Sequence, residues 1–151
     1  MTAAKNKSAG VKVSAVFEPE RTVRCSLPLY TASVSAGFPS PAEDYVEGKL
    51  DLNKHLIKHP SATFFVRVTG DSMIDAGIHD GDLLIVDRAV EPSDGAVVIA
   101  AVDGELTVKR IRKRDGKVLL VAENRRYAPM AIGEGSQFDV WGVVTNVIHS
   151  L

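Results

Sequence analysis

The sequence predicts a mainly β fold: a compact domain of antiparallel strands and hairpins with one short helix, preceded by an extended N-terminal arm. Three observations predict it. Short runs rich in Val, Ile and Phe alternate with Gly, Asp and Pro over most of the chain. Two Asp-Gly pairs, at 103–104 and 115–116, lie between such runs, where they suit tight hairpin turns. A helical pattern is confined to residues 51–59.

We expect residues 1–36 to form an arm and not a domain. Residues 1–10 are small and polar, and cannot bury enough apolar surface to become ordered. Residues 11–17 alternate as a half-buried strand does, and Pro28 keeps the apolar run at 27–30 from being helical. The arm has no apolar period of 3.6 residues, so it cannot form the helix-turn-helix of a repressor. We expect no sequence-specific DNA binding.

The boundary of the arm is predicted at Gly37-Phe38-Pro39-Ser40-Pro41, because each Pro favours an extended residue before it. The expected domains are therefore 1–36 and 37–151. A short helix follows, with Asp51 as its cap and Pro60 as its stop. The expected strands are, in chain order, residues 63–68, 82–86, 96–102, 105–111, 117–121 and 138–148.

Composition narrows the class of protein. The chain has 151 residues, of which 45% are hydrophobic and 25% charged, as in ordinary globular proteins. Cys25 is the single cysteine, so no intramolecular disulfide can form and a reducing, cytoplasmic location is expected. No stretch approaches the roughly eighteen apolar residues of a membrane span, and no signal-peptide pattern begins the chain. We expect neither export nor membrane insertion.

The candidate chemistry lies at Gly70-Asp71-Ser72-Met73, after an expected strand, and at Lys109, within another. Strand alternation places Lys109 on one face with Thr107 and Ile111, both uncharged. If that face is buried, desolvation lowers the pKa of the lysine toward that of a general base. From spacing alone, a turn hydroxyl at Ser72 and a surface side chain at Lys109 remain the alternatives.

The motifs from Gly37 to the C-terminus resemble those of the LexA-type self-cleaving Ser-Lys peptidases, and among these the UmuD-like accessory subunits of error-prone DNA polymerases. The most specific feature is Ser72-Met73 followed by Lys109, 37 residues later, with a small residue–Gly bond upstream. The matching stretches also include HPSATFFVRVTGDSM at 59–73, GIHDGDLLIVDRA at 77–89, VIAAVDGELTVKRI at 98–111 and WGVV at 141–144.

The resemblance implies a role for each site residue. Ser72 would be the nucleophile and Lys109 its general base, with backbone amides of Asp71 and Ser72 donating to the oxyanion. The cut would fall in the same chain, between Ala36 and Gly37. No metal and no organic cofactor is implied.

The resemblance also implies partners: a second copy in a homodimer, a RecA filament on single-stranded DNA that stimulates cleavage, and a UmuC-like Y-family polymerase that joins the processed dimer. The implied setting is SOS-response translesion synthesis. Three alternatives remain. They are a catalytically silent dimeric module that regulates a polymerase, a truncated LexA-like regulator, and a type I signal peptidase, which would need a membrane anchor. Cleavage within one protomer and cleavage across a dimer both remain open.

Other conspicuous residues receive structural interpretations. His55 and His59 have the spacing of a helical metal pair, but neighbouring lysines would repel a cation, so a solvated helix face is expected. Trp141 is expected in the core or a dimer interface. The basic cluster is expected to be a soluble hairpin tip, with contact to RecA, polymerase or DNA phosphates as its alternative; it consists of Arg110, Arg112, Lys113 and Arg114.

Overall fold

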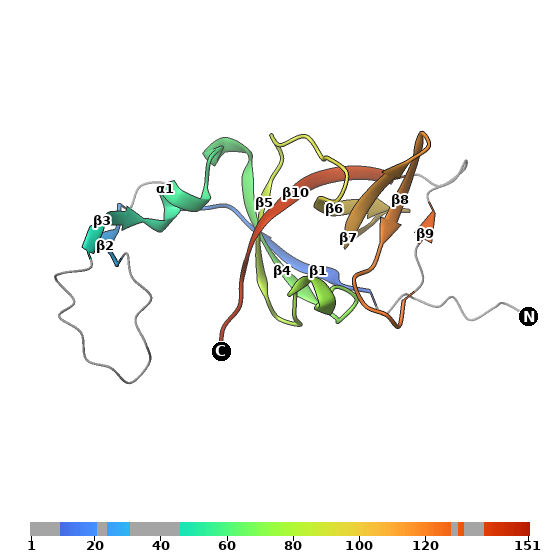
Figure 1. The fold of residues 1–151 in the computed structure, drawn as a ribbon, viewed down its shortest axis with the longest axis horizontal. Helices are drawn as coiled ribbons and strands as arrows, with labels where there is room; N and C mark the ends of the chain where they lie inside the picture. The colour runs from blue at the N-terminus through green and yellow to red at the C-terminus, as the bar shows by residue number, and fades with distance from the viewer. Residues whose placement is uncertain (1–9, 21–23, 31–45, 128–129, 132–137) are drawn as a thin grey trace, which may run out of the picture. The chain divides into compact units, whose positions relative to one another are not determined.

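The computed structural model describes residues 10–20, 24–30, 46–127, 130–131 and 138–151. The chain divides into two units. One comprises Met1–Pro19 and His59–Leu151, and the other Glu20–Lys58 (Figure 1). Strands dominate both units, so the predicted mainly β fold is confirmed. The expected division at Gly37 lies outside the described residues and stays a prediction.

The larger unit is an antiparallel sheet of eight strands in the order β1-β4-β5-β10-β6-β7-β8-β9. An extra pairing of β1 with β7, at Lys12 and Thr107, closes six of these strands into a ring. The N-terminal strand therefore lies between β4 and β7. The strands are β1 (Lys12–Phe17), β4 (Thr63–Thr69), β5 (Leu83–Asp87), β6 (Val97–Val102), β7 (Glu105–Arg114), β8 (Lys117–Val121), β9 (Met130–Ala131) and β10 (Phe138–Ile148).

The two predicted hairpin turns are confirmed. Asp103 and Gly104 have φ values of 49° and 84°, and Asp115 and Gly116 have 51° and 72°. Positive φ at both central residues matches the right-handed twist of the flanking strands, and Asp-Gly tolerates it at low cost. β7 extends beyond the expected end at Ile111, because β8 pairs with it as far as Arg114.

The sheet has apolar side chains on both faces, which form two clusters. The first lies inside the ring and the second covers part of the other face of β6, β7, β8 and β10. Val108 belongs to the first cluster and Ile111 to the second, as alternation along β7 predicts. The buried members of the first are Val11, Val66, Val68, Met73, Ile78, Leu84, Val86, Ile99 and Val108, and those of the second are Val98, Ala100, Ile111, Leu120 and Val143.

The smaller unit contains a two-stranded pairing of β2 (Ser26–Tyr30) with β3 (Val46–Asp51), followed by α1 (Leu52–Leu56). The Asp51 side chain accepts a hydrogen bond from the Asn53 amide, so the predicted cap is confirmed. The predicted extension of the helix to His59 is wrong. Ile57 is already extended, and Pro60 begins a separate 3₁₀ turn, η2 (Pro60–Ala62).

No helix within the described ranges is long and apolar enough to cross a membrane.

Candidate active site

The turn that carries Ser72 is held in place on both sides. Gly70 follows β4 with φ of +101°, a conformation that suits glycine, and its amide donates to the Asp80 carboxylate at 2.9 Å. Met73, on the other side, is fully buried and leads into the 3₁₀ turn η3 (Ile74–Ala76). Ser72 between them has no exposed surface. The serine hydroxyl is thus fixed at the edge of the ring interior.

Asp71 is anchored by residues that the sequence did not point to. Its carbonyl oxygen accepts hydrogen bonds from the Asn124 amide group at 2.8 Å and from the Ile74 N–H at 3.1 Å. The Tyr127 hydroxyl donates to the Asp71 carboxylate at 2.8 Å, and this bond raises the pKa of Tyr127. Asn124 and Tyr127 lie in a polar loop after β8 without periodicity, so local pattern could not identify them.

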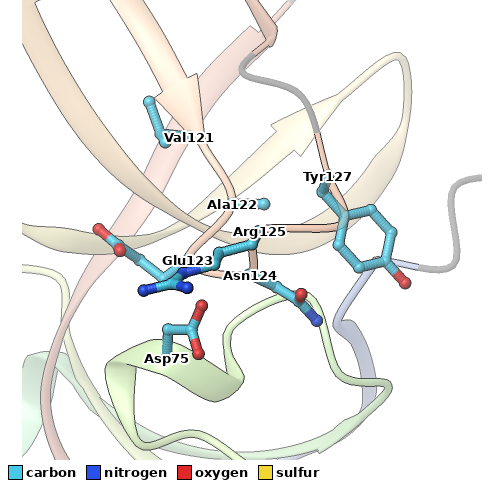
Figure 2. A pocket seen from close by; sticks show the side chains of 7 residues that line it. All are labelled: Asp75, Val121, Ala122, Glu123, Asn124, Arg125 and Tyr127. Atoms are coloured by element: carbon cyan, nitrogen blue, oxygen red, sulfur yellow. The ribbon is translucent and has the colours of Figure 1, made fainter.

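A pocket of about 560 Å³ lies beside this turn. Figure 2 shows its lining, in which Asp75 of η3 faces the loop after β8. The Asp75 amide donates to the Glu123 carbonyl at 2.7 Å, which ties η3 to that loop. The pocket is lined by Asp75, Val121, Ala122, Glu123, Asn124, Arg125 and Tyr127.

Lys109 lies on the apolar face predicted for it. Its side chain is on the face of β7 that also carries Ile111, and its partner on β6 is the fully buried Val98. Only 6% of Lys109 is exposed, although it carries an ammonium group in its ordinary state. Desolvation by this burial lowers the pKa of Lys109. The neutral amine, which a lysine general base requires, therefore forms more easily here than at an exposed lysine.

Val11 connects the serine turn to the lysine strand. Its N–H donates to Ser72 Oγ at 2.7 Å. Its carbonyl oxygen accepts from the Val108 N–H at 3.2 Å and from Thr107 Oγ1 at 3.0 Å. The side chain of Val11 is fully buried in the first cluster. One residue of the N-terminal segment thus lies between Ser72 and the part of β7 next to Lys109.

The two predicted catalytic residues are therefore linked through the backbone of Val11, which bonds to Ser72 Oγ on one side and to residues of β7 next to Lys109 on the other. Within the described residues, no hydrogen bond joins Ser72 Oγ to Lys109 Nζ. The roles of Ser72 and Lys109, and those of the Asp71 and Ser72 amides at an oxyanion, stay predictions. The expected cleavage site, Ala36-Gly37, lies outside the described residues.

The other conspicuous residues are bound in structural contacts. His55 and His59 do not share a helix face, because α1 ends at Leu56, and His59 contacts the Asp87 carboxylate at 2.5 Å. Trp141 packs against the first cluster and lies 5.3 Å from the Phe64 ring, between centroids. In the basic cluster, Arg110 pairs with Glu123 and donates to the Gly95 carbonyl, Arg112 approaches Glu123 at 3.8 Å, and Lys113 donates to Pro92.

A cluster that the sequence did not suggest lies at the C-terminal end of β10. The buried Asp82 carboxylate accepts from the His79 backbone amide at 2.7 Å and contacts His149 Nδ1 at 2.5 Å. Burial by itself raises the pKa of Asp82, but these hydrogen bonds and the two histidine charges outweigh it, so the pKa is lowered. The three side chains offer ligand atoms within 4.8 Å of one another, an arrangement able to hold a metal ion.

Comparisons with known proteins agree with the motifs. The family model described as Peptidase S24-like matches residues 28–145. SamA of Salmonella typhimurium is 46% identical over 134 residues, which covers 89% of this chain and 93% of SamA. MucA of Escherichia coli is 43% identical over 138 residues, covering 90% and 92%. The LexA repressor of Alteromonas mediterranea is 39% identical over 144 residues, covering 95% of this chain and 68% of the repressor.

The family match supports a serine peptidase type. The chain belongs to the Peptidase S24-like family. Within that family it is similar to UmuD-like proteins, among them SamA and MucA, so the resemblance predicted from the motifs is confirmed.

Proposed function

We propose that this chain is a self-cleaving serine peptidase of the SOS mutagenesis response, which cuts itself between Ala36 and Gly37. The observation that supports this most is that an extended segment bonds to Ser72 on one side and to β7, the strand of Lys109, on the other, while Ser72 and Lys109 are both buried. A groove that accepts an extended strand is what a peptide substrate requires. Family membership agrees with this function.

The proposed reaction begins with neutral Lys109. Its amine removes the proton from the Ser72 hydroxyl as Oγ attacks the carbonyl carbon of Ala36. The carbonyl oxygen becomes an oxyanion, to which the backbone amides of Asp71 and Ser72 donate. Each such donor is worth about 3 kcal/mol in other serine peptidases. The Asp71 carbonyl and carboxylate contacts keep this part of the turn from moving during the reaction.

The tetrahedral intermediate then collapses. Lys109, now an ammonium, gives its proton to the nitrogen of Gly37, and the Ala36–Gly37 bond breaks. An ester remains between Ser72 and Ala36. Water attacks the carbonyl carbon of this ester while Lys109 takes a proton from the water. The ester bond then breaks, Lys109 returns that proton to Ser72 Oγ, and residues 1–36 leave with a new carboxyl group at Ala36.

The proposal includes partners. A RecA filament on single-stranded DNA would favour the cleavage-competent state by population shift and would supply no catalytic group. The processed chain would form a homodimer and assemble with a UmuC-like Y-family polymerase. We propose a cytoplasmic location for these steps. The support for them is the similarity to UmuD-like proteins.

The test is intact-mass analysis of the purified chain at neutral and alkaline pH, with and without activated filament. Wild type is expected to split between Ala36 and Gly37, and Ser72→Ala and Lys109→Ala are expected to stay whole. Lys113→Ala is the matched control, because Lys113 lies on the same strand, is exposed, and its side chain bonds only to the Pro92 carbonyl in the described contacts. Equal splitting in all four proteins would contradict the assignment of the dyad.

An alternative is a catalytically silent binding module. It is favoured by one observation, that Ser72 Oγ is bonded to Val11 and not to Lys109. A folded wild type that stays whole under every condition, filament included, would support this alternative and contradict self-cleavage.

A further inference from the structure

The N-terminal strand segment, residues 10–17, occupies the place at Ser72 that a substrate would take. It pairs antiparallel with β4 from Lys12 to Phe17 and reaches β7 through the pair Lys12 and Thr107. β4 leads into the Ser72 turn and β7 carries Lys109. The segment thus adds a strand between the two strands that position the candidate dyad, which is a recognised way for a protein to bind an extended peptide.

The fit of this segment at Ser72 is close. A Cβ atom added to Gly70 would lie 2.7 Å from the carbonyl oxygen of Gly10, so only glycine at 70 leaves room for it. Val11 has no exposed surface, and both its backbone polar groups are bonded across the groove. The space beside Ser72 is therefore filled, and it cannot hold a second strand at the same time.

The geometry at Ser72 does not favour cutting of the bound segment. The Val11 N–H lies in the plane of the Gly10–Val11 peptide group and points at Ser72 Oγ. The oxygen therefore sits near that plane, on the nitrogen side. A nucleophile attacks a carbonyl carbon from above the plane, along the Bürgi–Dunitz direction. The segment is bound as a ligand and not as a substrate poised for attack.

The sequence suggests why two segments suit the same groove. The tripeptide Ser-Ala-Gly occurs at 8–10, where its glycine begins the bound segment, and again at 35–37, across the expected cleavage site. The close contact at Gly70 is made by backbone atoms of Gly10 and Val11, which every residue has, so the space left by the missing Cβ of Gly70 also suits the backbone at Gly37.

We propose that residues 10–17 are a resident ligand of the Ser72 groove, which competes with the Ala36–Gly37 segment and so restrains self-cleavage. This inference rests on the proposed function. Both segments are tethered to the groove by the same chain, so each has a high effective concentration, and their relative affinities decide which one is bound. Cleavage then proceeds only in the fraction of molecules whose groove is vacated, so the observed rate equals that fraction of the rate with a fully vacated groove.

The main test is Val11→Asp in the full chain, with Val90→Asp as its control. Both are Val to Asp changes, but Val11 is fully buried at Ser72 whereas Val90 lies outside the bound segment, in the loop after β5, and is 36% exposed. Val11→Asp is expected to raise the rate of Ala36–Gly37 cleavage, about tenfold if one wild-type molecule in ten is vacated. Val90→Asp is expected to cleave at the wild-type rate. Equal rates for Val11→Asp and wild type would overturn the proposal.

A milder variant guards against misfolding of Val11→Asp. Thr107→Val removes the hydroxyl that donates to the Val11 carbonyl but keeps the shape of the side chain. Loss of one such bond is expected to raise the cleavage rate about two- to tenfold. Wild-type product whose mass shows a cut before or after Gly10 would also overturn the proposal, since the segment would then be a substrate.

A second readout does not depend on cleavage. In a Ser72→Ala background, a labelled synthetic peptide of residues 30–42 is expected to bind more tightly when Val11→Asp is present, and an unlabelled peptide of residues 8–18 is expected to displace it. If the 8–18 peptide displaces the labelled peptide but wild type never cleaves, the two segments compete for the groove and the proposed function is wrong. Peptide affinity that is the same with and without Val11→Asp would refute competition.

Discussion

At the residue scale, the burial of Lys109 is the property on which the chemistry depends. An exposed lysine is almost wholly protonated at neutral pH and cannot accept a proton from serine. The apolar neighbours Val98 and Ile111 make the ammonium form costly, so the pKa of Lys109 falls below its ordinary value of 10.5. In the proposed reaction, the lowered pKa of Lys109 determines how the cleavage rate depends on pH.

We predict that the cleavage rate rises with pH to a plateau and that the midpoint of the rise lies below pH 10.5. The reason is that the fraction of neutral Lys109 rises as the pH passes its lowered pKa. The measurement is the first-order rate of wild-type cleavage from neutral to alkaline pH. Lys109→Arg, which stays protonated throughout, is expected to remain uncut. A pH-independent rate would show that another step or group limits the reaction.

Asp82 makes the stability of the folded state depend on pH. Its pKa is lowered in the folded state, so the folded state binds fewer protons than the unfolded chain at acidic pH. The stability from its contacts with His79 and His149 is therefore present above the ordinary pKa of 3.8 and is lost as the pH falls through the lowered value.

We predict that Asp82→Asn lowers the free energy of unfolding at pH 7 by about 1.5 to 3 kcal/mol, the range for hydrogen bonds to a charged group. Below the lowered pKa, the difference from wild type is expected to shrink. Urea unfolding of both proteins at neutral and acidic pH measures it. Asp139→Asn, an exposed site on β10, is the control. A constant difference across pH would show that the charge of Asp82 does not matter.

At the element scale, the Ser72 turn depends on a loop far along the chain. Asn124 follows β8, yet its amide group holds the Asp71 carbonyl. Without that bond, the Ile74 N–H still donates to the carbonyl at 3.1 Å, so the turn stays folded but is less constrained. Small displacements of a nucleophile reduce rates steeply, because attack needs a close and directed approach.

We therefore predict that Asn124→Ala cleaves about tenfold more slowly than wild type, with little loss of thermal stability. Arg125→Ala is the control, since it lines the same pocket but is not among the described contacts of Asp71. The measurements are the cleavage rate and the melting temperature of each variant. If Asn124→Ala cuts at the wild-type rate, this loop does not position the turn for catalysis.

At the scale of the whole molecule, local patterns predicted the strands and hairpins well. Residues 97–121 show two Asp-Gly turns between alternating runs, so both the turns and the face of Lys109 followed from sequence. Contacts between distant segments did not follow. The closure of the ring by β1, its bond to Ser72 and the pairing of Asp82 with His149 depend on which strand edges meet, and no local period encodes that.

Some residues of the candidate site could likewise be predicted from the sequence, and others could not. Ser72 and Lys109 were predicted from a motif and its spacing, whereas Asn124 and Tyr127 lie in an irregular polar loop. Val11 was expected on a half-buried strand, but its place at the serine was not foreseen. The segment after Ser-Ala-Gly at 8–10 fits the groove because that groove accepts backbone, for which side-chain patterns carry little information.

The central claim is that Ser72 and Lys109 cut the chain between Ala36 and Gly37. Intact-mass analysis of wild type and Lys109→Ala, incubated at alkaline pH, tests it most directly. We predict two wild-type fragments, one ending at Ala36 and one beginning at Gly37, and a Lys109→Ala protein that stays uncut. Wild type that remains whole while folded, or a Lys109→Ala protein that splits at the same bond and rate, would contradict it.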